Sequence, residues 1–180
     1  CSSDLSAYGW KIDQDAEVAQ LTEEIRTGTQ TTREPVYSMR ANAYGYNDIG
    51  STYIEVDLSS QHMYYYQSGS IIFDSDIVSG DIRYDDRATP PGIFTLYYKK
   101  SPDVLRGTKK ADGTYSYEQP VTYWMPFNGN VGIHDADTWR SEYGGEIYKT
   151  SGSHGCVNTP TANAEKIFNT VEIGTPVIVY

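Results

Sequence analysis

The sequence predicts a mainly β fold, a β-sandwich or open barrel with one late helix, preceded by a short N-terminal helix. From residue 51 to residue 134, several short runs alternate apolar and polar side chains, which is the period of a half-buried strand. Glycine, proline and asparagine turns separate these runs. One amphipathic helical pattern and one last strand follow them. This order fits a mainly β fold better than a parallel α/β arrangement.

The N-terminal part is expected to be a helix followed by a linker. In residues 13–27 apolar side chains recur at helical spacing, at Val18, Leu21 and Ile25. Asp13 or Asp15 can cap the start, and Gly28 follows the end. Residues 28–35 have the composition of a linker, and 36–50 show no clear period. Because one short amphipathic helix is not stable alone, it must pack on the main body or be the tail of an upstream domain.

The body is expected to consist of short strands over residues 54–58, 61–67, 71–78, 93–98, 121–127, 130–134 and 175–180. Ser68-Gly69 is typical of a hairpin turn, and 87–92 is a second turn. The polar residues 99–120 are expected to form a long mobile or functional loop, and 135–152 an irregular stretch.

The late helix follows residue 160. Its apolar residues recur at helical spacing, at Ala164, Ile167, Phe168 and Val171. Thr159 or Thr161 can cap it with Pro160 in the first turn, and Gly174 ends it.

Length and charge limit the possible functions. The 180 residues allow one domain, or one domain with a small attachment. The formal net charge of −10 offers no basic stripe for nucleic acid or for a membrane surface. No apolar run is long enough to cross a membrane. The chain begins at Cys1 without methionine, so we expect it to be a fragment of a longer protein.

The main chemical signal is Cys156, which has His154 two residues before it and His134 upstream. A thiol is a good nucleophile when an imidazole lies within hydrogen-bond reach. Near neighbours in a glycine-rich turn seldom point at each other, whereas His134 ends a predicted strand and can face Cys156 across a cleft. We therefore favour His134 as the base. A Cys1–Cys156 disulfide is not expected.

The glycines around the cysteine suit acyl transfer, because backbone N–H groups stabilise a developing oxyanion. Gly155 lets the backbone approach a ligand closely. The N–H groups of Gly155 and Cys156 are therefore the predicted donors, and Ser153 and His154 are expected to shape the loop and contact substrate.

Other interpretations stay open at this point. His134, His154 and Cys156 could supply three ligands to a zinc ion, although His-x-Cys is not a common zinc spacing. Cys156 could also be an inert core residue. His62 is expected to have only a packing or surface role.

These residues resemble a known family. His134, followed by Ser153-His154-Gly155-Cys156-Val157-Asn158, resembles the signature of L,D-transpeptidases of the YkuD type: a histidine, a gap, then Ser/Thr-His-Gly-Cys-hydrophobe-Asn. Several other stretches are similar to family forms, namely residues 53–58, 89–94, 123–127, 132–135 and 174–177. Residues 12–35 are similar to the end of the accessory domain of Gram-positive members.

The resemblance implies a catalytic domain over 51–180, with 1–50 as the helix and linker left from an accessory domain. It implies that Cys156 attacks the L,D bond of a peptidoglycan tetrapeptide stem, that D-alanine leaves, and that a second stem's side-chain amine takes the acyl group. His134 would be the base, with the backbone of His154, Gly155 and Cys156 around the oxyanion. Substrate contacts would come from Ser153, Gly155, Asn158, Tyr123 and Met125, the last two in a lid formed by 123–127 and the loop before it.

The resemblance also implies no metal and no cofactor, and acylation of Cys156 by carbapenems. We expect a monomer at the cell wall or the outer face of the membrane. Alternatives are an L,D-carboxypeptidase on the same substrate and a catalytically silent wall-binding module. A papain-like peptidase fits less well, because it would place the cysteine before the histidine in the chain.

Overall fold

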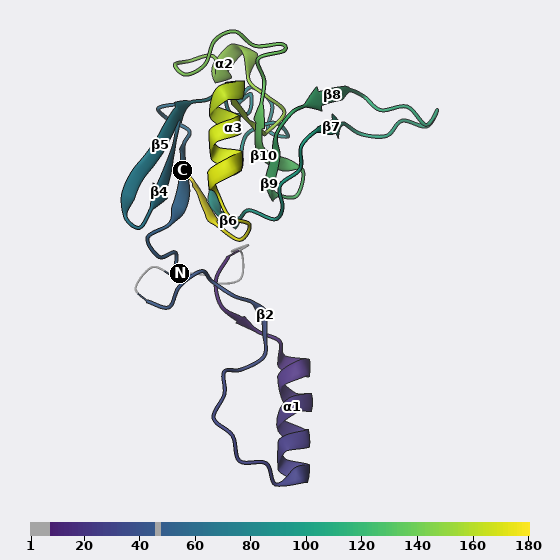
Figure 1. Ribbon diagram of the computed structural model, residues 1–180. Coiled ribbons are helices and arrows are strands. Elements are labelled where there is room, and N and C mark those ends of the chain that lie inside the picture. Colours follow the sequence, from purple (N-terminus) through teal and green to yellow (C-terminus); the bar gives the residue numbers. More distant parts are fainter. Residues whose placement is uncertain (1–7, 46–47) are drawn as a thin grey trace. The chain divides into compact units, whose positions relative to one another are not determined.

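The computed structural model describes residues 8–45 and 48–180, which form two compact units, 1–50 and 51–180 (Figure 1). Each unit is considered by itself. Cys1 lies outside the described residues, so a bond between it and Cys156 is not tested. No helix of the described part is long and apolar enough to cross a membrane.

The first unit contains the predicted helix and a strand pair that the sequence analysis missed. Its elements are β1 (Lys11–Ile12), α1 (Gln14–Thr27) and β2 (Tyr37–Met39). The Asp13 carboxylate accepts the Ala16 N–H at 3.0 Å, and Gly28 ends α1 with φ +68°. Both helix-end signals are confirmed. β2 pairs with β1 across the helix and linker, so its hydrogen-bond partner is not visible in local periodicity.

Arg33 fastens the linker of this unit to α1. Its Nη1 donates to Glu17 at 2.9 Å, and its Nε donates to Glu24 at 2.6 Å. Glu17 also accepts the Val36 N–H at 2.6 Å. The linker thus turns back along the helix and delivers β2 to β1.

The second unit, all of which is described, contains ten strands and two helices. The strands are β3 (Tyr53–Asp57), β4 (His62–Gln67), β5 (Ser70–Asp76), β6 (Gly92–Thr95), β7 (Asp103–Arg106), β8 (Glu118–Val121), β9 (Trp124–Asn128), β10 (Val131–Asp135), β11 (Val157–Thr159) and β12 (Pro176–Val179). The helices are α2 (Tyr148–Ser151) and α3 (Thr161–Thr170). The mainly β prediction is confirmed.

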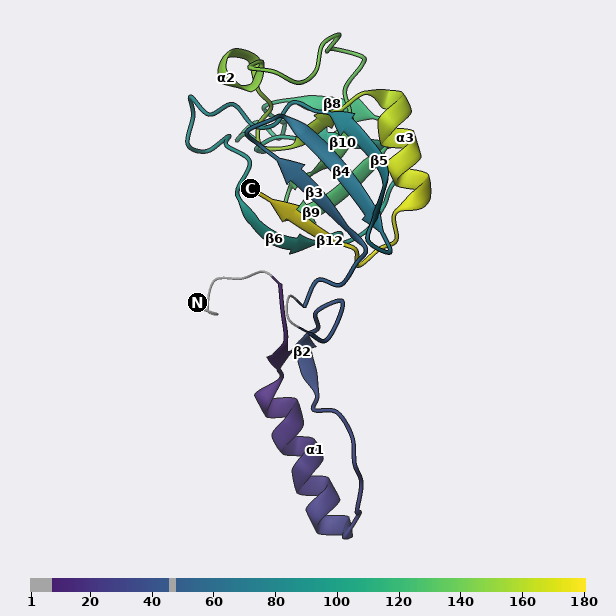
Figure 2. The same cartoon turned by 90° about the vertical axis from the view of Figure 1, so that its left-hand side faces the viewer.

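Two sheets enclose the core. The larger has the order β5-β4-β3-β12-β6, and the smaller has the order β11-β10-β9. In Figure 2 the larger sheet lies in front of the smaller one. Their inner faces and one side of α3 supply the fully buried side chains, among them Ile54, Met63 and Val177 from the first sheet, Phe127 and Ile133 from the second, and Ile167 from α3. Alternation along each strand therefore decides which residues become core.

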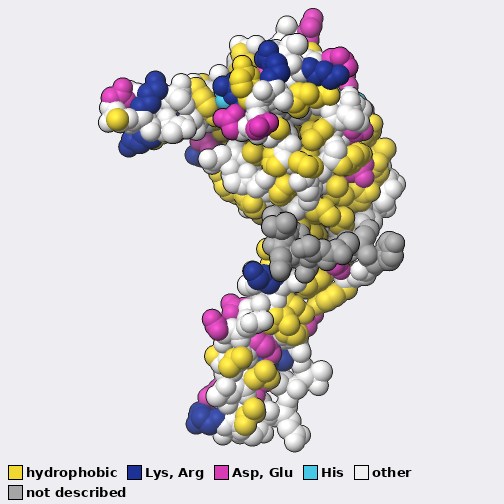
Figure 3. Space-filling model, turned by 180° about the vertical axis from the view of Figure 1, so that it is seen from behind, with side chains coloured by type: hydrophobic (Ala, Val, Ile, Leu, Met, Phe, Trp, Pro, Cys, Tyr) yellow, Lys and Arg dark blue, Asp and Glu magenta, His cyan; other side chains and the backbone are white. Residues whose placement is uncertain are grey.

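Three predicted details are wrong. Residues 99–120 are not an unstructured loop, because β7 and β8 pair as an antiparallel hairpin within them. Lysine and arginine side chains gather along this projecting hairpin, whose prolines and charges hide the strand pattern (Figure 3). β11 was not expected. Neither Thr159 nor Thr161 caps α3 with its side chain; the Asp137 carboxylate accepts the Thr161 N–H at 2.8 Å.

The core predicts a large difference between two isoleucines of the same sheet. Ile54 is fully buried in β3, whereas Ile72 in β5 is 52% exposed. We expect Ile54→Ala to lower the free energy of unfolding by about 2–5 kcal/mol, because it removes buried methyl groups and leaves a cavity. Ile72→Ala is the matched control and should cost about 0.5 kcal/mol or less. Urea unfolding measures both, and equal losses would contradict this assignment of the core.

Candidate active site

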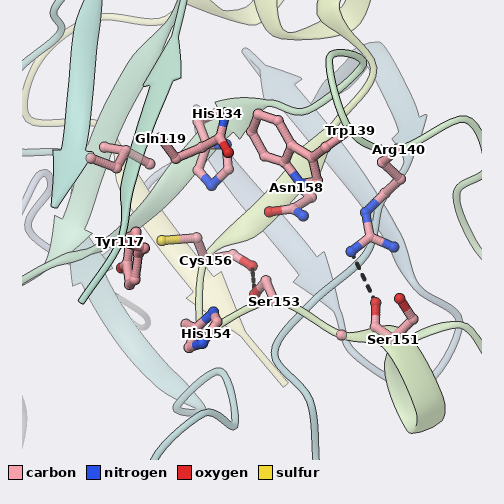
Figure 4. Close-up of a pocket in the computed structure, with 12 residues that line it drawn as sticks. Tyr117, Gln119, His134, Trp139, Arg140, Ser151, Ser153, His154, Cys156 and Asn158 are labelled. Atoms are coloured by element: carbon pink, nitrogen blue, oxygen red, sulfur yellow. Dashed lines mark hydrogen bonds between the residues drawn. The ribbon is translucent and has the colours of Figure 1, made fainter. Parts of the chain in front are cut away.

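The pairing of β10 with β11 brings the upstream histidine to the cysteine segment. The two strands are parallel, and His134 pairs with Asn158. Cys156 directly precedes β11 and is two residues before Asn158, so the alternation of side chains continues to it and it lines the same pocket as His134 and Asn158. Figure 4 shows the His134 imidazole and the Cys156 thiol on one side of the pocket, with the ring directed toward the cysteine.

These residues line a pocket of about 350 Å³. One wall comes from the β7–β8 hairpin, with Leu105, Tyr117 and Gln119. The opposite end is formed by the loop after β10 and the segment before Cys156, with Trp139, Arg140, Ser151 and Gly152. The cysteine therefore lies between a hairpin that can cover a ligand and a polar end that contains an arginine.

His134 is held in one tautomer. Its side chain is 4% exposed, and Nδ1 lies 2.9 Å from the backbone carbonyl oxygen of Asp135. A carbonyl oxygen only accepts, so Nδ1 carries the proton and Nε2 has a free lone pair. Burial lowers the pKa of His134, which keeps the ring neutral at neutral pH. A neutral imidazole with a free Nε2 can accept a proton.

The Asp135 carboxylate does not orient the imidazole, because it binds two backbone N–H groups instead. Its Oδ1 accepts the N–H groups of Thr122 at 2.8 Å and Tyr123 at 2.7 Å. The backbone of Asp135, and not its side chain, fixes the imidazole. The carboxylate instead anchors the segment that leads from the hairpin into β9.

The pocket favours the neutral form of the Cys156 thiol, whose side chain is half-buried. Burial raises its pKa to about 11, because a thiolate loses hydration there. The sulfur donates to the Asn130 carbonyl oxygen at 3.5 Å. The neutral thiol and neutral imidazole fit a nucleophile that gives up its proton during attack, and not one that is stored as a thiolate.

His154 takes a different position from His134. Its ring packs on Tyr117, with the ring centroids 5.3 Å apart, and Figure 4 shows it on the far side of the cysteine. Partial burial and the charge of Arg87 lower its pKa. His154 thus lines the wall where the hairpin meets the cysteine turn, which agrees with a shaping role.

Ser153 fixes the turn that carries the cysteine. Its hydroxyl accepts the Gly155 N–H at 3.0 Å and donates to the Cys156 carbonyl oxygen at 2.5 Å. Gly155 has φ +112°, a conformation that favours glycine. Since the Gly155 N–H is already engaged by Ser153, the prediction that it is a free oxyanion donor is corrected. The N–H of Cys156 remains the candidate.

Thr89 holds this turn from the opposite side. Its buried hydroxyl accepts the Gly80 N–H at 2.8 Å and donates to the Gly155 carbonyl oxygen at 2.8 Å. One hydroxyl thus links two backbone segments that are far apart in sequence. The orientation of the Gly155–Cys156 peptide group depends on this link.

Tyr123 and Met125, two of the predicted substrate contacts, are not at the pocket, whereas Ser153 and Asn158 line it. Met125 is fully buried in the core, and Tyr123 packs its ring on Phe168 with centroids 5.2 Å apart. The pleat of β9 turns Met125 into the core, Tyr123 lies just before β9 against α3, and the hairpin supplies the wall of the pocket instead. Asn158 does line the pocket, and its buried Oδ1 has no hydrogen-bond partner among the described residues. That oxygen can accept from a ligand.

Sequence reasoning missed Tyr117, Trp139 and Arg140. All three lie in stretches without a regular period, which hides their direction. The only available signal was composition, since Trp139 is one of three tryptophans in the chain and follows His134 closely.

The zinc alternative has no geometric support. Among the residues that the structure describes, no group of three histidine, cysteine, aspartate or glutamate side chains is arranged to hold a metal ion. His154 packs on Tyr117 and does not converge with His134. His62 is elsewhere, between Asp74 and Asp76, at 2.8 Å from each.

Comparisons with known proteins agree on one family. The model of the L,D-transpeptidase catalytic domain, YkuD, matches residues 51–179. No curated protein matches the chain.

Solved structures extend this likeness. A cysteine-to-serine variant of Enterococcus faecium L,D-transpeptidase is 43% identical with a TM-score of 0.77, over 97% of this chain and 67% of that one. The carbamoyl enzyme of Ldtfm with avibactam is 44% identical with a TM-score of 0.76, over 97% and 66%. The E. faecium catalytic domain acylated by ertapenem is 49% identical with a TM-score of 0.63, over 76% and 100%. The chain thus spans about two thirds of the length of the first two structures.

The hydroxyl of Thr89 provides a test of how the turn is held. Thr89→Val keeps the shape but leaves the buried Gly80 N–H without an acceptor, so we expect unfolding to become easier by about 1–3 kcal/mol. The rate of Cys156 alkylation should change as well, because the turn that carries the cysteine loses its hydrogen bond to Thr89. Thr89→Ser retains the hydroxyl and is the control. If valine behaves like serine in both measurements, the link has no such role.

The raised pKa of the thiol predicts the pH dependence of its alkylation. Between pH 7 and 10 the rate with iodoacetamide should rise by about tenfold per pH unit, because the thiolate fraction grows by that factor below the pKa. Mass spectrometry of the Cys156-containing peptide measures the rate. In the urea-unfolded protein the curve should level off near about pH 8.5. A plateau below that pH in the folded protein would show a stored thiolate and refute the neutral pair.

Proposed function

The chain belongs to the YkuD family of L,D-transpeptidase catalytic domains, enzymes that act on peptidoglycan, and we propose that Cys156 is the nucleophile of a cysteine acyltransferase reaction. The single observation that supports this most is the thiol beside a buried, neutral imidazole whose Nε2 is free. Each reacting group of an acyl transfer then has a residue to serve it.

In the first half-reaction, Nε2 of His134 takes the proton of the Cys156 thiol as the sulfur attacks the carbonyl before the terminal D-alanine of a tetrapeptide stem. The C–N bond then breaks, and His134 returns the proton to the leaving amine. A thioester and free D-alanine result. In this proposal the Cys156 N–H stabilises the intermediate oxyanion. The unpartnered Oδ1 of Asn158 accepts an N–H of the stem.

In the second half-reaction, a side-chain amine of another stem attacks the thioester. His134 takes the amine proton and returns it to the sulfur, which closes the cycle with a third-to-third cross-link. If water attacks instead, the same groups perform the L,D-carboxypeptidase reaction, which is the second candidate function. The hairpin wall with Leu105 and Tyr117 favours transfer, since a wall beside the thioester reduces the access of water.

The inhibitor and location follow from the same proposal. Two of the similar structures are acylated or carbamoylated, by ertapenem and by avibactam. We propose that a carbapenem acylates Cys156 of this chain. We also propose that the enzyme works at the cell wall or the outer face of the membrane, where cross-linked stems are, and that it works as a monomer.

Three variants rank the catalytic groups. With a disaccharide-tetrapeptide substrate, we expect Cys156→Ala to abolish D-alanine release. His134→Ala should lower the rate by about 10²–10⁴-fold, because it removes the proton carrier, whereas His154→Ala should lower it by about tenfold or less. Product mass spectrometry separates cross-linked dimers from hydrolysed tripeptides. Cross-linking that persists in Cys156→Ala would refute the mechanism. A greater loss of rate in His154→Ala than in His134→Ala would make His154 the base instead of His134. A silent wall-binding module would release no D-alanine at all.

A further inference from the structure

Arg140 places an unpaired positive charge at one end of the pocket. Its side chain lines the pocket with Ser151 and Trp139, at the end away from the hairpin. Nη2 donates to the Ser151 carbonyl oxygen at 2.9 Å, and this is a neutral acceptor. The described residues provide no carboxylate within salt-bridge distance of this guanidinium, although acids outnumber bases in the chain by 24 to 14.

The guanidinium also has an unused donor. Its Nε is buried and has no hydrogen-bond partner among the described residues. A buried donor on a charged group is unfavourable when unpaired, and more so than a neutral one. An arginine in this state is suited to an anion, because Nε and the Nη groups present parallel N–H bonds to a carboxylate.

The arginine is held in place before any ligand arrives. Its backbone N–H donates to the Ala136 carbonyl oxygen at 2.9 Å, just after β10, and its side chain reaches across to the end of α2 at Ser151. The two contacts join both sides of the loop from 136 to 151. Little ordering is left for binding, which favours affinity.

The catalytic histidine limits which carboxylate can bind. Arg140 and His134 line the same pocket, so one ligand can contact both side chains. The leaving amine must come to Nε2 of His134 to receive its proton. In a terminal amino acid the carboxylate is attached to the carbon next to that amine, so it must lie within a few ångströms of Nε2.

We propose that Arg140 binds the terminal carboxylate of the donor's leaving amino acid and thereby selects donors that end one residue after the bond to be cut. The identity of the ligand rests on the proposed function; the presence of a carboxylate site does not. A donor whose last residue is amidated, or extended by another residue, presents no charge at this position and leaves the guanidinium unpaired.

A pair of small reagents tests the carboxylate site without any assumption about the reaction. Iodoacetate and iodoacetamide both alkylate Cys156 and differ by one charge. We expect the ratio of their rates, iodoacetate to iodoacetamide, to fall by about fivefold in Arg140→Gln relative to the wild type, because the cation no longer attracts the anion. Arg140→Lys should keep most of the ratio. Both rates in a ratio are measured on the same protein, so a loss of stability in a variant affects both rates and does not change their ratio.

The control is Arg26→Gln, which removes the same charge from an exposed site on α1 of the first unit, where Arg26 pairs with Glu23. Its ratio should equal that of the wild type. An unchanged ratio in Arg140→Gln would overturn the carboxylate site, and an equal fall in Arg26→Gln would assign the effect to net charge and overturn it as well.

A second measurement tests which carboxylate is bound. The wild type should release D-alanine from a free tetrapeptide stem with at least about tenfold higher kcat/KM than alaninamide from the amidated stem, and Arg140→Gln should lose this preference by slowing only the free acid. Equal slowing of both stems, or a preference that persists, would refute the donor assignment. A third result is that the wild type turns over neither stem while the alkylation ratio still falls in Arg140→Gln. That result would contradict the proposed transpeptidase reaction but would still support the carboxylate site.

Discussion

The parallel pairing of β10 with β11 is the constraint on which the site depends. The register that sets His134 opposite Asn158 also directs Cys156 to the same face, because side chains alternate. A shift by one residue would turn the cysteine into the core. The hydroxyls of Ser153 and Thr89 then fix the turn before β11, so backbone pairing sets the position of the thiol and two side-chain hydroxyls set its orientation.

Burial determines the protonation state of that pair. The same low-polarity surroundings raise the pKa of the thiol and lower the pKa of the imidazole, so the uncharged forms of both are favoured. The proton therefore moves when a substrate carbonyl and an oxyanion donor are present to stabilise the new charge. Arg140 is the exception in this pocket, since it keeps its charge and meets a neutral carbonyl instead of a carboxylate. Because this charge has no carboxylate partner, we assign an anion to the Arg140 end of the pocket.

The sequence was sufficient where the signal is local. Alternating residues predicted most strands of both sheets, Asp13 and Gly28 marked the ends of α1, and the Ser-His-Gly-Cys run marked the reacting turn. It failed where the partner is distant. The β7–β8 hairpin was read as a loop, because prolines and charges interrupt its pattern and only cross-strand bonds reveal it. The resemblance placed Met125 at the substrate, but the direction of a side chain on β9 depends on which face meets the core, and Met125 is on the core face. Trp139 and Arg140 lie on irregular backbone, where no period gives a direction.

The mechanism requires a neutral His134 imidazole, protonated at Nδ1, that takes the proton of a neutral thiol. Nitrogen-15 NMR of the His134 ring measures this protonation state. We expect a neutral ring at pH 7 with the proton on Nδ1, and the same signals in Cys156→Ala, because the Asp135 carbonyl oxygen and burial determine that state. An imidazolium in the wild type that becomes neutral in Cys156→Ala would show a stored thiolate–imidazolium pair and would contradict the account.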